Sequence, residues 1–154
     1  MTAPRLDTSF VVRYFMRDPP DAGQRAAQII DGGVDVGIGS VVLAETAHVL
    51  KSVYRIPREQ IVDALIALVE KETIQPLHLD RSVLVEALRL CRPSGRVSVP
   101  DALLWAEARS SGAYAVYTFD RQFPSDGIRV LSSADDAAGA SSDDGTAGAT
   151  GGAT

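Results

Sequence analysis

The stretch PDALLWAEARSSGAYAVYTFDRQF, residues 100–123, contains a helix pattern, a strand pattern and an acidic residue in direct succession. Its opening Pro and Asp101 favour the first turn of a helix, and Gly112 favours the end of that helix. The apolar run 115–118 then predicts a short strand, and Asp120 follows it closely. This stretch therefore predicts a helix that leads into a strand, with a carboxylate just past the strand's carboxyl end.

The same alternation of helix and strand extends over the rest of the chain. Ser40 is expected to cap the third helix, and the first strand is expected to be short, because Arg5 does not suit a buried parallel strand. Helices that alternate with strands predict an α/β fold, with a mostly parallel central sheet and helices on both of its faces. Hydrophobic spacing and the positions of Pro and Gly predict helices over 9–17, 21–31, 40–53, 57–72, 80–92 and 100–112, and strands just before Asp7 and over 34–39, 74–79, 115–118 and 128–131.

The chain of 154 residues is expected to form one domain, residues 1–133, followed by a disordered low-complexity tail, residues 134–154. The tail has no aromatic or large aliphatic residue, so it cannot bury enough apolar surface to offset the entropy of ordering it. Its four Asp residues account for most of the net charge of −5. The acidic total therefore does not exclude a nucleic-acid substrate for the folded part.

Two further features bear on the location of the protein. Cys91 is the single cysteine, which excludes an internal disulfide and fits a reducing cytoplasm. It is expected to be a small buried residue rather than a nucleophile. The N-terminus has no long apolar run, so neither a signal peptide nor a membrane span is expected. We therefore expect a cytoplasmic protein.

Four acidic residues stand just past or just inside expected buried elements: Asp7, Glu45, Asp101 and Asp120. Ligands of parallel α/β sheets lie at the carboxyl ends of the strands, so one edge of the sheet can receive all four. Mg²⁺ takes oxygen ligands and is usually held by a few carboxylates with water and phosphate oxygens. The four acids are therefore candidate metal ligands and catalytic residues for phosphodiester cleavage, with Asp7 and Asp101 as first choice for direct contact.

Each acid has a plainer interpretation when taken alone. Asp101 can be a helix cap, Asp120 a turn residue and Glu45 a solvated helical residue, although the apolar neighbours of Glu45 disfavour the last. Ser9 and Thr118 each stand two residues from an acid, where a hydroxyl can hydrogen-bond a carboxylate or a metal-bound water. The alternatives are capping for Ser9 and ordinary strand propensity for Thr118.

Taken together and in this order, LDTSF with Asp7, LAE with Glu45, PDALLWAEA with Asp101 and YTFDRQF with Asp120 resemble the four acidic motifs of the PIN-domain ribonucleases, in particular the VapC-type toxins of bacterial toxin–antitoxin pairs. The resemblance covers about residues 6–131. It implies an endoribonuclease that depends on Mg²⁺ or Mn²⁺, on a flavodoxin-like three-layer α/β/α sandwich. It also implies a homodimer, an RNA substrate and tight inhibition by a cognate VapB-type antitoxin.

Three other classes of protein share features with this sequence. A phosphatase of the haloacid-dehalogenase type also has an Asp after its first strand, but the place of its second Asp holds Ser9 here. A receiver domain of a response regulator needs a late Lys, and no Lys follows Lys71. A PIN-fold module that binds RNA or protein without catalysis stays open, and RNA cleavage with Mg²⁺ or Mn²⁺, compared with an EDTA control, distinguishes it from a nuclease.

Overall fold

The structure is a computed structural model, and it describes residues 2–93, 96–134 and 136. The expected tail, residues 134–154, lies outside the described residues apart from Ala134 and Asp136. Within the described part, no helix is both long and apolar enough to cross a membrane. The elements are α1 (Thr8–Met16), α2 (Pro20–Ile30), β1 (Val36–Ile38), α3 (Ser40–Ser52), α4 (Arg58–Val69), β2 (Ile74–Pro76), α5 (Arg81–Leu90), α6 (Val99–Ser111), β3 (Ala115–Tyr117) and β4 (Arg129–Leu131).

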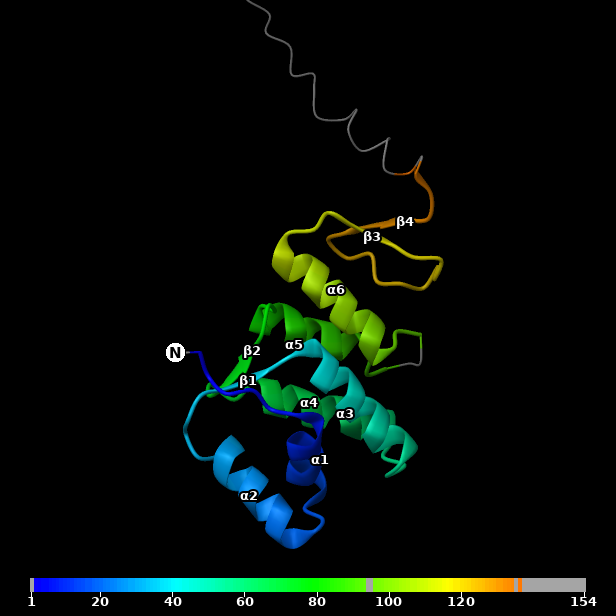
Figure 1. The fold of residues 1–154 in the computed structure, drawn as a ribbon. Helices are drawn as coiled ribbons and strands as arrows, with labels where there is room; N and C mark the ends of the chain where they lie inside the picture. Colours follow the sequence, from blue (N-terminus) through cyan, green and yellow to red (C-terminus); the bar gives the residue numbers. More distant parts are fainter. Residues whose placement is uncertain (1, 94–95, 135, 137–154) are drawn as a thin grey trace, which may run out of the picture.

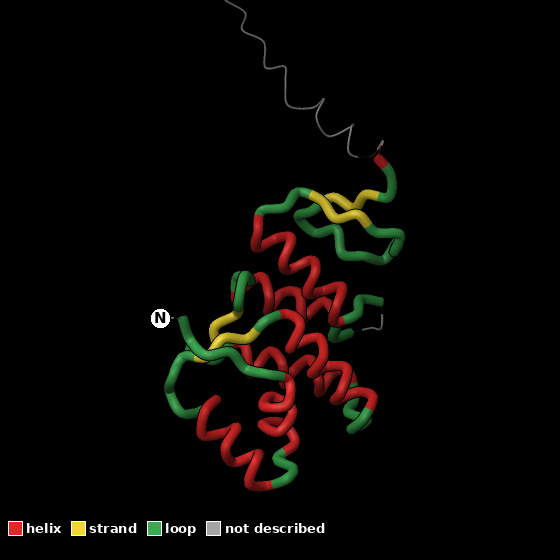
Figure 2. Tube along the Cα trace, in the orientation of Figure 1, coloured by secondary structure: helices red, strands yellow, loops and turns green. Residues whose placement is uncertain are grey.

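Helices and strands alternate along the chain, and the strands pair in parallel (Figures 1 and 2). This confirms the α/β fold that the sequence predicts. Strand β1 pairs with β2, with Val36 opposite Ile74. On the other side of β1, the amide of Leu6 donates to the carbonyl of Gly37 at 2.8 Å. The N-terminal segment forms only an isolated bridge, between Arg5 and Gly37, so it is even shorter than the strand expected there.

Strands β3 and β4 form a second parallel pair, with Val116 opposite Val130. The described strands thus fall into two two-stranded sheets rather than one continuous sheet. In Figure 1 the second pair lies beyond α6, at the top of the view, apart from β1 and β2. Asp120 follows β3 and therefore belongs to a different sheet from the segment that leads into Asp7.

The helices enclose one hydrophobic cluster. Trp105 on α6, Leu65 on α4 and Leu43 on α3 are among its fully buried members. The indole Nε1 of Trp105 donates to the backbone carbonyl of Asp126 at 3.0 Å, so the polar atom of this buried ring is satisfied. Because α3 and α6 both pack against this core, it holds in place the two helices that carry Glu45 and Asp101.

The ends of two helices test the sequence predictions directly. Ser98 caps α6 with its side chain, and Gly112 ends it with a φ of 76°, as its lack of a Cβ atom permits. The expectation that Ser40 caps α3 is wrong. Gly39 stands at the cap position, and the hydroxyl of Ser40 instead donates to a carboxylate oxygen of Glu107 on α6. A carboxylate is a stronger acceptor than a neutral group, and this bond ties α3 to α6.

Candidate active site

Asp7 is the N-cap of α1. Its Oδ2 accepts a hydrogen bond from the hydroxyl of Ser9 at 2.7 Å and one from the amide of Ser9 at 3.2 Å. The hydroxyl bond above all, with the amide bond second, holds the pKa of Asp7 below its ordinary value. The carboxylate is exposed, so at neutral pH it is charged and accessible to a ligand.

Glu45 lies on α3 and lines the same cavity as Asp7, with a volume of about 320 Å³. The apolar neighbours of Glu45 suggested that it would not be solvated, but its side chain is exposed. The helical repeat explains the difference. Leu43, Ala47 and Leu50 turn toward the core, while the period of 3.6 residues leaves Glu45 on another side of the helix. Two exposed acidic residues from separate elements therefore line one cavity.

Asp101 stands in the first turn of α6 and is half-buried. Its amide donates to Oγ of Ser98 at 3.2 Å. Burial raises the pKa of the Cys91 thiol to about 11, opposed by the charge of Arg58 and reinforced by that of Asp101. The carboxylate of Asp101 thus acts on the end of α5, and it is not among the groups that line the cavity of Asp7 and Glu45. Cys91 is buried, as expected.

Asp120 organises the loop that follows β3. Its Oδ1 accepts from the amide of Gln122 at 2.8 Å, and its own amide donates to Oγ1 of Thr118 at 3.0 Å. Thr118 therefore contacts the backbone of Asp120 rather than its carboxylate, whereas Ser9 does contact the carboxylate of Asp7. Asp120 is exposed and lies outside the cavity of Asp7.

Asp7 and Glu45 thus line one cavity, whereas Asp101 and Asp120 are not among the residues that line it. Across the residues that are described, no group of three or more His, Cys, Asp or Glu side chains could hold a metal ion. The pair still fits a divalent cation, because Mg²⁺ is commonly bound by one or two carboxylates and completes its shell with water and phosphate oxygens. Ser9 supplies the hydrogen bond that orients one of the two carboxylates. Metal contact by Asp101 and Asp120 stays a prediction.

The sequence did not predict that two further residues line this cavity and contact each other. Arg13 and Tyr54 both line it, and Nη1 of Arg13 donates to the hydroxyl of Tyr54 at 3.2 Å. Arg13 lies on α1, the helix that Asp7 caps. Its position on that helix could have indicated that it lies near Asp7. Tyr54 lies just past α3 and offered no such signal, because only the packing of α1 against α3 brings it near.

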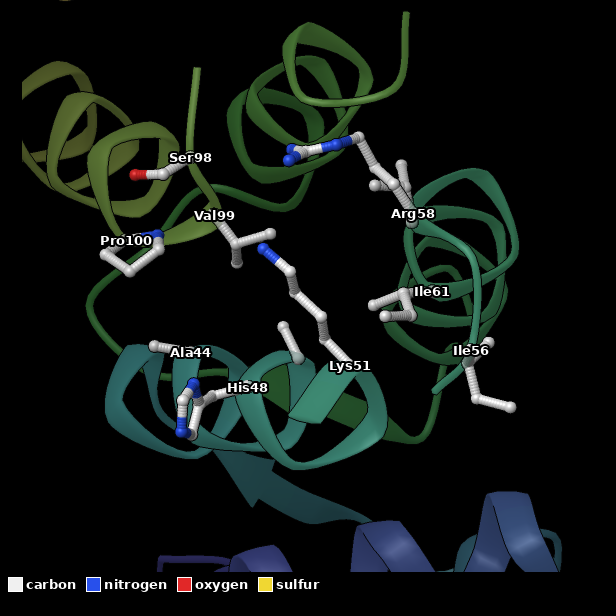
Figure 3. Close-up of a pocket in the computed structure, with 11 residues that line it drawn as sticks. Ala44, His48, Lys51, Ile56, Arg58, Ile61, Ser98, Val99 and Pro100 are labelled. Carbon is white, nitrogen blue, oxygen red and sulfur yellow. The ribbon is translucent and has the colours of Figure 1, made fainter. Parts of the chain in front are cut away.

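A second cavity, of about 360 Å³, lies between α3, α4 and the start of α6. Figure 3 shows Lys51 and Arg58 extending into it from α3 and α4. Most of its other lining residues are aliphatic, and no carboxylate is among them. Neither Asp7 nor Glu45 lines this cavity, and its lining residues offer no carboxylate to a hard cation.

Parallel strands that alternate with helices, with one carboxylate beyond an N-terminal extended segment and another on a helix that follows a strand, define an α/β protein with a candidate hydrolase site. The family model described as PIN domain matches residues 6–125. Because this match spans well over half of the chain, the chain belongs to the PIN-domain family. PIN domains are generally nucleases and typically use divalent metal ions. No curated protein matches the chain.

Proposed function

We propose that this PIN domain is a metal-dependent endoribonuclease, the toxin of a VapC-type toxin–antitoxin pair. The observation that carries the nuclease activity is the cavity that Asp7 and Glu45 share, in a chain whose family is generally nucleolytic. The assignment to toxins rests on the order of the four acidic motifs along the sequence. It includes a homodimer, a VapB-type antitoxin and a cytoplasmic location, which the single cysteine favours.

The residues of the cavity have distinct roles in this proposal. Asp7 and Glu45 would hold Mg²⁺ or Mn²⁺, and the bound ion would polarise a phosphate oxygen and lower the pKa of a water molecule. Ser9 lowers the pKa of Asp7 and would orient its carboxylate. In hydrolysis, the oxygen of a water forms a bond to phosphorus, the P–O bond to the leaving nucleoside breaks, and the leaving oxygen takes a proton.

The test of this function is cleavage of a labelled oligoribonucleotide with Mn²⁺ and with EDTA. Glu45→Gln should abolish the cleavage that Mn²⁺ supports. Glu86→Gln is the matched control, since Glu86 is likewise an exposed helical Glu and lies on α5, outside the cavity of Glu45. Equal activity of Glu45→Gln and the unaltered protein would contradict the proposed site. Binding of RNA without any cleavage would favour the alternative of an inactive binding module.

A further inference from the structure

Arg13 lines the cavity of Asp7 and Glu45, here called the acid cavity. Its Nη1 donates to the backbone carbonyl of Asp18 at 2.8 Å and to the hydroxyl of Tyr54 at 3.2 Å. Both of these bonds use the same nitrogen of the guanidinium group. An arginine has five N–H donors in a planar fork, so the group is anchored at one corner while its other nitrogens keep donors for a ligand.

A smaller cleft adjoins the acid cavity. It lies between α1 and α2, has a volume of about 250 Å³, and is lined by Ser9, Phe10, Arg13 and Arg25 among others. Ser9 and Arg13 line both the cleft and the acid cavity, so the two hollows adjoin along one side of α1. A ligand that extends from the acid cavity into this cleft would pass Arg13 first and Arg25 next.

The charges of the cleft favour an anionic ligand. Arg25 forms an ion pair with Asp21 at 4.0 Å, and both side chains are largely exposed. A pair with this geometry contributes little and is easily exchanged for a better partner. Phe10 adds a partly exposed apolar ring, 39% accessible, which suits the face of a base. Two arginines beside an aromatic ring thus match the phosphates and one base of a single strand.

We propose that Arg13 and Arg25 form a phosphate-binding subsite for the single-stranded RNA substrate, beside the acid pair on the α1–α2 side. The proposal rests on the proposed nuclease function and adds the direction in which the strand leaves the site. Arg13 contacts the phosphate next to the scissile one, and Arg25 contacts the phosphate beyond it. Tyr54 is a positioning residue that holds Arg13 in place. A planar guanidinium suits this task because it binds two phosphate oxygens at once.

The experiment measures binding of a fluorescein-labelled single-stranded oligoribonucleotide by anisotropy, in EDTA so that no metal-dependent cleavage occurs, at a series of salt concentrations. Arg13→Gln should raise the Kd about tenfold at low salt, and Arg25→Gln should raise it several-fold. Each loss of one phosphate contact should reduce the slope of log K against log salt by about 0.7. Arg89→Gln, on the exposed surface of α5, is the control and should leave both Kd and slope unchanged.

Two further variants keep the test independent of folding. Arg13→Lys retains the charge and should recover part of the affinity, and Tyr54→Phe removes the anchor and should weaken binding with the same melting temperature. Unchanged salt slopes in both Gln variants would overturn the subsite and leave the nuclease proposal standing. If the wild type binds RNA without cleaving it, and the Gln variants bind more weakly with smaller salt slopes, the subsite is supported and the nuclease proposal is contradicted. Absence of RNA binding by the wild type at low salt would overturn the subsite directly.

Discussion

The hydroxyl of Ser9 and the backbone amide of Ser9 both donate to Oδ2 of Asp7, at 2.7 and 3.2 Å. One oxygen of the carboxylate is thus committed to the start of α1, and the same residue lines the cavity shared with Glu45. The same pair of bonds serves two purposes. It caps the helix, and it sets the charge and direction of a candidate metal ligand.

The first prediction concerns the titration of Asp7. Its pKa in the folded protein is lowered, with the Ser9 hydroxyl as the main cause. A lowered pKa means that the stability from these bonds is present above the ordinary pKa of Asp and is lost as pH falls through the folded value. Ser9→Ala should therefore raise the pKa of Asp7 toward 3.8. NMR titration of the Asp7 carboxyl carbon measures this, and an unchanged midpoint would show that Ser9 does not control it.

The second prediction separates capping from metal binding at Asp7. Asn caps a helix about as well as Asp, whereas replacement of a cap by Ala costs about 0.5–2 kcal/mol. Asp7→Asn should therefore keep the melting temperature in EDTA, and Asp7→Ala should lower it, while both variants lose Mn²⁺-dependent RNA cleavage. Melting curves and cleavage assays on the same preparations provide the comparison. Wild-type cleavage by Asp7→Asn would mean that the residue is only a cap.

The third prediction concerns the acids that lie outside the cavity. The motif order leads us to expect that Asp101→Asn abolishes cleavage. The helix should survive the change, because Ser98 caps α6 with its own side chain. Asp126→Asn is a control, since Trp105 and Arg109 hydrogen-bond to the backbone carbonyl of Asp126 rather than to its side chain. Full activity of Asp101→Asn would show instead that Asp7 and Glu45 suffice without it.

The fourth prediction concerns the bond between α3 and α6. Ser40→Ala removes the donor to the half-buried carboxylate of Glu107, and an acceptor left without its donor costs about 1–3 kcal/mol. Urea denaturation should show a loss of this size. Ser52→Ala, at the exposed end of α3, removes a hydroxyl that bonds to its own helix and should change stability by about 0.5 kcal/mol or less. Equal effects of the two changes would refute a special role for the Ser40 bond.

The fifth prediction concerns the C-terminal segment. Residues 137–154 contain no aromatic or large aliphatic side chain, whereas Asp136 accepts hydrogen bonds from the amides of Ser132 and Ser133. A chain ended after Asp136 should therefore keep both its melting temperature and its RNA cleavage. The two assays above measure this. A large loss of rate with an unchanged melting curve would assign the missing segment a part in catalysis.

Local signals in the sequence determined the elements and the family. The helix that ends at Gly112 and the strand that follows it were predictable, because a glycine at a helix end and an apolar run act over a few residues. The order of the acidic motifs indicated a PIN domain before any packing was known, and the family match bears this out. The nature of Cys91 as a buried thiol followed from the apolar helix around it.

Tertiary structure alone decided how these parts meet. The sequence predicted four acids at one sheet edge, whereas the described strands form two pairs. Asp7 and Glu45 line one cavity, and Asp101 and Asp120 are not among its lining residues. The sequence predicted that Ser40 caps α3, but the packing of α3 against α6 places the carboxylate of Glu107 within hydrogen-bond reach of its hydroxyl. Tyr54 reached Arg13 in the same way. Such contacts join residues far apart along the chain, and they depend on how whole elements pack rather than on the pattern within any one of them.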